Sequence, residues 1–229
     1  MKALLTPKKL AKFCAIIWPK LLGFSLLSLI PTLIWIMTKV PIDFQQGIVA
    51  KIMYIHIPSA ILSLGLFAVI GIASILFLVY KIKIAPMLIR AILPIGLMST
   101  IIVLVTGSIW GKPTWGTWWI WDARLTSELL LGFIYLMLYT YDKVTNQNNS
   151  WVVAVLALIG LIDLPIIHYS VTWWHTLHQG PSILALQKPT IAWPMLWPLL
   201  LMIINLACLT AAIVLLRCQI IVDSFNRKT

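Results

Sequence analysis

The residues most suggestive of chemistry form a tryptophan-rich stretch between positions 110 and 124. Trp115, Trp118, Trp119 and Asp122 are spaced i, i+3, i+4 and i+7, which places them on one face of a helix. We therefore expect a short amphipathic helix in the membrane interface, with an indole face that favours a flat apolar ligand. The alternative is an aromatic belt that anchors the protein at headgroup depth. A belt poorly explains five tryptophans within twelve residues.

Histidines supply the second group of candidate residues. His56 begins a long apolar run, and His178 lies in a polar segment near a second tryptophan pair. Neutral imidazoles are the commonest ligands of haem iron, and two from separate segments can bind it from opposite faces. A single histidine at a membrane edge is more often a hydrogen-bonded interfacial residue, and it is the two histidines together, on the same side as the tryptophans, that favour iron binding. His175 and His178 have the spacing of a zinc pair, but no cysteine or carboxylate cluster completes such a site.

The composition requires lipid as solvent for most of the chain. Of 229 residues, 61% are hydrophobic and only 10% are charged, whereas a soluble domain has about a quarter charged. The net charge of +11 comes from basic residues in short segments between apolar runs, which is the pattern that orients membrane proteins. The chain carries no nucleic-acid-binding motif, so we expect lipid contacts and no nucleic acid.

Six apolar runs are long enough to cross a bilayer as helices. The chain is therefore predicted to be an all-α integral membrane protein, a single polytopic domain over residues 1–229. The run after the N-terminal lysines lacks a cleavage site and is expected to remain as an anchor. The expected spans are 21–38, 54–80, 88–110, 123–141, 151–169 and 192–216.

The distribution of lysine and arginine predicts the orientation. Twelve lie in the termini and the two loops on their side, against five on the other side, so both termini are expected in the cytoplasm. The outer loops are then about 39–53, 110–124 and 170–191, and all four histidines fall on that side or at its edge. This pattern predicts a bacterial inner membrane protein with a periplasmic site; a mitochondrial inner membrane fits as well.

These stretches match a known family. The chain resembles the cytochrome c maturation protein C family, also called the haem exporter protein C family, over essentially its whole length. The matching stretches are 43–47, 54–56, 107–113, 115–128 and 164–180. The run 115–126 is highly specific for haem-handling proteins that share a tryptophan-rich motif.

The resemblance implies six helices, cytoplasmic termini and a b-type haem that is held transiently. It implies that His56 and His178 are the axial iron ligands. Its expected partners are a periplasmic haem chaperone that receives the haem, a very small membrane subunit and an ATP-binding transporter pair. Beyond the resemblance, a flat ring needs a platform and its propionates need cations, for which Arg124 and Lys112 are candidates. The expected haem-binding residues are His56, His178, Trp115, Trp118, Trp119, Trp121, Asp122 and Arg124.

Other readings remain open at this point. A membrane subunit with a permanent electron-transfer haem would carry histidines mid-membrane, and a transporter would move another apolar substrate. No nucleophile and base pair is found on the outer side, so an enzyme is not expected. Glu128 follows Arg124 by four residues, which predicts an ion pair. His175 stands where the family pattern has Asn, and we expect it to hydrogen-bond near the site without binding iron.

Overall fold

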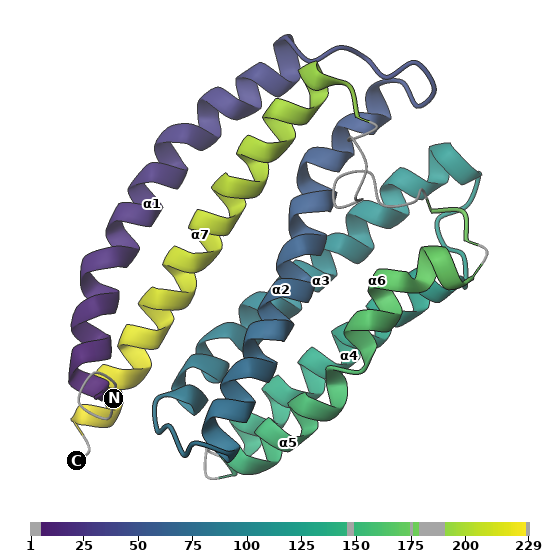
Figure 1. The fold of residues 1–229 in the computed structure, drawn as a ribbon. Coiled ribbons are helices and arrows are strands. Elements are labelled where there is room, and N and C mark those ends of the chain that lie inside the picture. Colours follow the sequence, from purple (N-terminus) through teal and green to yellow (C-terminus); the bar gives the residue numbers. More distant parts are fainter. Residues whose placement is uncertain (1–5, 146–148, 175, 179–190, 228–229) are drawn as a thin grey trace.

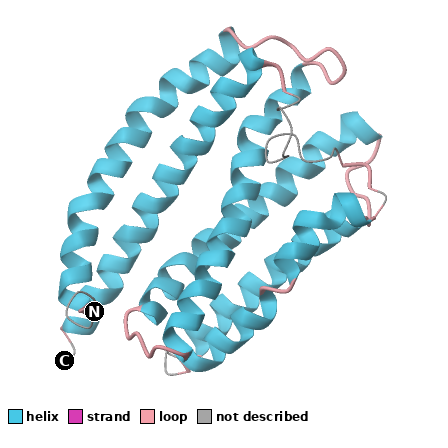
Figure 2. Cartoon of the chain, viewed as in Figure 1, coloured by secondary structure: helices cyan, strands magenta, loops and turns pink. Residues whose placement is uncertain are grey.

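A computed structural model describes residues 6–145, 149–174, 176–178 and 191–227. Over these residues the chain is helical, and they contain no strand beyond one isolated bridge. Figure 2 shows the described residues as helices joined by loops of different lengths. The helices are α1 (Pro7–Thr38), the 3₁₀ helix η2 (Ile48–Ile52), α2 (Met53–Leu78), α3 (Ala85–Trp115), α4 (Ala123–Val144), α5 (Ser150–Gly160), α6 (Asp163–Trp173) and α7 (Trp193–Asn226). The prediction of an all-α integral membrane protein is confirmed.

Within the described ranges, five helical segments are long and apolar enough to cross a membrane: α1, η2 with α2, α3, α5 with α6, and α7. They correspond to five of the six expected spans. The remaining one, α4, has 22 residues and packs against α3, α5 and α6. It is less apolar because Arg124, Glu128 and Asp142 lie along it. Its length of about 33 Å, at 1.5 Å per residue, still matches the bilayer core.

The first helix begins earlier than expected, at Pro7 instead of near residue 21. Thr6 caps it, since its hydroxyl accepts a hydrogen bond from the amide of Lys9 at 3.4 Å. Proline in the first turn favours a helix start because its fixed φ is already helical and it has no amide to satisfy. Lys8, Lys9, Lys12 and Lys20 therefore lie on the helix, ahead of its apolar part.

The expected single helix over 151–169 is in fact two, α5 and α6, separated at Leu161 and Ile162. Pro165 explains the break. Proline has no amide hydrogen, and its ring crowds the carbonyl four residues earlier, which here belongs to Leu161. That carbonyl accepts a bond from the amide of Leu164 instead, at 3.2 Å.

The first and last helices lie side by side along their length, as Figure 1 shows, and α1 packs mainly against α7. Polar side chains join them in the middle. Ser25 donates to the carbonyl of Asn205 at 3.1 Å, and the Asn205 amide donates to Thr32 at 3.3 Å. The other helices pack into a second group, joined to the pair through contacts of α7 with α2 and α3.

The helices α2, α3 and α4 pack closely against one another in the middle of this second group. Gly96 of α3 lies against the ring of Tyr135, which occupies the space that a side chain would need. The Tyr135 hydroxyl donates to the carbonyl of Ser63 at 2.8 Å. At one end of this group the start of α2, the end of α3 and the start of α4 come together, opposite the end where the chain termini lie (Figure 1).

Candidate functional site

The tryptophan-rich segment connects α3 to α4 and is not helical as expected. The helix α3 continues through Trp115 and ends at Gly116, whose φ of +81° is accessible to glycine without strain. Residues 116–122 form bends and extended chain, and α4 starts after Asp122. The prediction of a short interfacial helix was therefore wrong. A glycine at this position favours a helix end, and in the structure this local preference prevails over the i, i+3, i+4 spacing of the tryptophans.

His56 lies in the first turns of α2 and faces α3. Its Nδ1 is 3.0 Å from the hydroxyl of Thr106, and its ring packs edge-on against Trp110 with centroids 5.6 Å apart. Gly107 provides the room, since a Cβ there would lie 3.2 Å from Cε1 of His56. Thr106 and Gly107 thus set the position of this imidazole, although sequence reasoning assigned them no role.

His178 comes from the segment between α6 and α7, more than a hundred residues away from His56 in sequence. Its Nδ1 is 2.9 Å from Oδ2 of Asp122, and its ring lies edge-on to Trp115 at 4.7 Å between centroids. Burial lowers the pKa of the His178 imidazole, while the bond to Asp122 opposes this shift and the charge of Arg124 adds to it. Burial is the largest effect, so the ring is neutral at pH 7 and donates through Nδ1 to the carboxylate.

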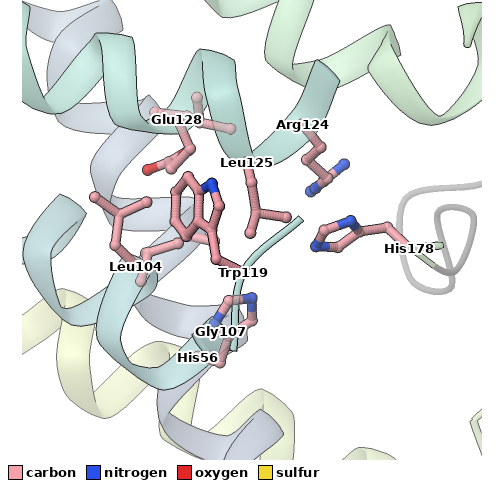
Figure 3. A pocket seen from close by; sticks show the side chains of 11 residues that line it. His56, Leu104, Gly107, Trp119, Arg124, Leu125, Glu128 and His178 are labelled. Atoms are coloured by element: carbon pink, nitrogen blue, oxygen red, sulfur yellow. The ribbon is translucent and has the colours of Figure 1, made fainter. Parts of the chain in front are cut away.

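Both imidazoles line one pocket at this end of the bundle. It holds about 450 Å³ of empty space, part of it open to solvent. Figure 3 shows His56, His178, Trp119 and Arg124 directed into the same region, although they come from α2, the last loop, the α3–α4 connection and α4. The remaining lining residues are Ala60, Leu64, Val103, Leu104, Gly107, Leu125 and Glu128.

The tryptophans do not share one face. Trp119 lines the pocket, and its Nε1 is buried without a hydrogen-bond partner among the described residues. Trp115 contacts His178, whereas Trp118 is 58% exposed and Trp121 is 76% exposed. The rings of Trp119 and Trp121 pack at 5.5 Å between centroids. The expected platform of Trp115, Trp118 and Trp119 is thus split, because the segment that carries them turns at Gly116.

Glu128 also departs from expectation. No ion pair with Arg124 lies within 4.0 Å in the described structure, whose ion pairs are Arg90–Asp142 and His178–Asp122. Glu128 instead accepts a hydrogen bond from Ser63 at 2.8 Å, and that hydroxyl is 2.7 Å from Thr100. A buried carboxylate needs such partners, and α2 and α3 provide them from across the bundle.

Three further candidates remain to be placed. His175 is outside the described residues, so its role stays a prediction. His168 packs against Tyr169 in α6 and is not among the residues that line the pocket. Lys112 donates to the carbonyl of Gly116 at 3.0 Å and closes the end of α3.

Comparisons with known proteins identify the family of the chain. The profile of the family described as Heme exporter protein C matches residues 1–229. The chain is 44% identical to Heme exporter protein C of Haemophilus influenzae, over 92% of this chain and 87% of that protein. It is 41% identical to the Escherichia coli K12 protein of the same name, over 89% and 84%. A ccmC-like mitochondrial protein of Marchantia polymorpha is 41% identical over 84% and 81%. The chain belongs to the haem exporter protein C family.

Proposed function

We propose that the chain binds haem between His56 and His178 and delivers it to a periplasmic haem chaperone for the maturation of c-type cytochromes. The observation that carries the proposal is the meeting of these two imidazoles in one pocket, from α2 and from the last loop. The names of the related proteins, with haem export and cytochrome c biosynthesis in them, support the same cargo.

The hydrogen bonds of the two rings fit iron binding. A carboxylate only accepts, so Nδ1 of His178 carries a proton, and in the neutral ring Nε2 then keeps its lone pair. Thr106 donates its only proton to the carbonyl of Ile102 at 2.6 Å, so His56 must donate to Thr106 through Nδ1. Both rings therefore present the Nε2 lone pair as the atom available to a metal.

The other expected residues have distinct places in the proposed site. Trp119 supplies apolar contact inside the pocket, and its free Nε1 donor fits a polar group of a ligand. Arg124 is the cation of the pocket that suits a propionate. Trp118 and Trp121 are exposed, and we assign them to the ring edge or to the chaperone surface. Asp122 acts through His178.

The proposed orientation places the site end in the periplasm and both termini in the cytoplasm. It follows from the excess of lysine and arginine on the terminal side. The resemblance to the family supports a b-type haem held transiently, a very small membrane subunit and an ATP-binding transporter pair as further partners. His56 lies in the first turns of α2 and not in mid-span, which disfavours a permanent electron-transfer haem.

An absorption spectrum of the purified protein tests the proposal. The wild type with added haem should show a low-spin spectrum with two imidazole ligands, and the chaperone should remove this haem. His56→Ala or His178→Ala should each abolish that spectrum, with partial recovery in imidazole. His168→Ala is the matched control, since His168 does not line the pocket, and should behave as wild type. If both ligand variants kept the wild-type spectrum, the proposed iron ligation would be wrong.

A further inference from the structure

Asp122 has two hydrogen-bond partners, one on each carboxylate oxygen. Its Oδ1 accepts from the amide of Leu125 at 2.8 Å and so caps the N-terminus of α4. Its Oδ2 is 2.9 Å from Nδ1 of His178, and the Asp122 side chain is only 6% exposed. One residue therefore fixes the start of a helix and also holds a ring that comes from a loop 56 residues later.

His56 has a different partner in the same role. Its Nδ1 donates to the Thr106 hydroxyl at 3.0 Å. This acceptor is neutral. The two imidazoles thus share one tautomer, but only His178 donates to a full negative charge. Hydrogen bonds to an ionised acceptor are roughly twice as strong as those between neutral groups.

An acceptor on Nδ1 affects what Nε2 can do. When Nδ1–H is drawn toward a carboxylate, the ring gains electron density and Nε2 becomes a more basic ligand. A hydroxyl group acts in the same direction but more weakly. Burial strengthens the difference, because the Asp122 charge is screened less at 6% exposure than it would be at the surface.

We propose that Asp122 is a positioning residue that directs Nε2 of His178 into the pocket and makes His178 the stronger donor of two unequal axial ligands. This inference rests on the proposed function, since it concerns the same two ligands. It adds that the ring held by the carboxylate favours ferric over ferrous iron, because a more basic nitrogen stabilises the higher charge.

Asp122→Asn separates the two roles of the residue. Asparagine caps helices as well as aspartate does, so its amide oxygen can still accept from Leu125. The amide nitrogen would then face Nδ1 of His178, donor against donor. We expect an unchanged melting temperature of the apoprotein in detergent and an affinity for ferric haem at least about tenfold lower, as measured by spectroscopic titration.

The reduction potential of the bound haem distinguishes the proposed role of Asp122 from a purely structural one, because a purely structural role would leave the potential unchanged. A tenfold loss confined to ferric haem raises the midpoint potential by about 59 mV. Thr106→Val is the matched control, since it removes the neutral acceptor of the other ring at similar size. It should shift the potential less than Asp122→Asn does. If Asp122→Asn folds poorly, Asp122→Ser takes its place. It keeps a capping hydroxyl without the carboxylate and should show the same rise in potential that is expected for Asp122→Asn.

The outcomes distinguish this inference from the proposed function. If Asp122→Asn has the wild-type affinity and potential, or if Thr106→Val shifts the potential as much, the inequality of the ligands is refuted while haem binding stands. If the wild type shows no spectrum of two imidazole ligands, the proposed function fails and this inference fails with it.

Discussion

The two ends of the helix group α2–α6 both hold polar side chains away from water, yet the hydrogen-bonding groups at the two ends are satisfied to different extents. At the end near the chain termini, Arg90 donates to Asp142 at 3.1 Å and to Ser150 at 2.6 Å. At the other end, Trp119 Nε1 has no partner in the described part of the chain, and both histidines keep a lone pair at Nε2. Polar groups that satisfy one another hold a fold together, whereas groups left incomplete in a shared pocket indicate a ligand.

The largest effect is expected from removing the ion pair at the end of the helix group near the chain termini. Arg90→Ala leaves Asp142 without its ion-pair partner, at 9% exposure of that side chain. Removing one member of a buried pair costs about 3 kcal/mol or more. The melting temperature in detergent should fall markedly, while the folded fraction should bind haem with the wild-type spectrum. A changed spectrum with an unchanged melting temperature would contradict the division between the two ends.

The next largest effect is expected at the pocket end of the helix group, where two neighbouring tryptophans should respond differently to substitution. Trp119→Ala removes a ring that lines the pocket, which is worth about 3 kcal/mol, or more than a hundredfold in haem affinity. Trp118→Ala removes a ring that is 58% exposed and should change haem affinity only a few-fold. The double variant should resemble Trp119→Ala in haem titrations. Loss of either single variant from the membrane would favour the anchoring belt instead.

A smaller effect is expected at the wall behind His56. In Gly107→Ala the new Cβ would lie 3.2 Å from Cε1 of the ring, so the imidazole must shift by a few tenths of an ångström. Crowding of this kind costs about 1 kcal/mol or more. Haem affinity should fall several-fold with little change in melting temperature. Ser108→Ala, on the same helix and outside the pocket lining, should leave the affinity unchanged.

The smallest effect is expected at His175. Iron accepts one ligand per face, and His178 is the ring that shares the pocket with His56. His175→Asn should therefore leave the haem spectrum and chaperone loading nearly unchanged, whereas His178→Asn should damage both. The opposite result would move the iron ligand to His175 and remove the argument for Asp122.

Much of the fold could be predicted from the sequence because lipid imposes a simple rule on it. A span must be long and apolar, and such runs are readable without knowing what they contact. The interruptions of helices are harder to predict from the sequence. Pro165 and Gly116 each favour an interruption, but each competes with the helical pattern of its neighbours, and packing decides the outcome.

The candidate site could be predicted in its residue types but not in its contacts. Two histidines and a tryptophan-rich segment on one side of the predicted membrane are residue types that suggest haem. The bonds of His178 to Asp122 and of His56 to Thr106 join positions 56 and 50 apart, and no local pattern encodes them. Glu128 shows the same limit. Its partner Ser63 lies on α2, whereas the i, i+4 spacing predicts Arg124, which is on the same helix as Glu128.

The pairing of α1 with α7 has a consequence for how the protein is made. The polar contacts between Thr32 and Asn205 join positions 173 residues apart. At a synthesis rate of about 5–20 residues per second, α1 waits roughly 9 to 35 seconds in the translocation machinery or in lipid before its partner exists. During that time Ser28 and Thr32 do not depend on α7, because each donates to a carbonyl four residues earlier, at 2.7 Å. Ser25 differs, since its hydroxyl donates to the carbonyl of Asn205 and gains this partner only when α7 is present. The first helix can therefore be inserted with one hydroxyl still to be paired, and its assembly with α7 comes last.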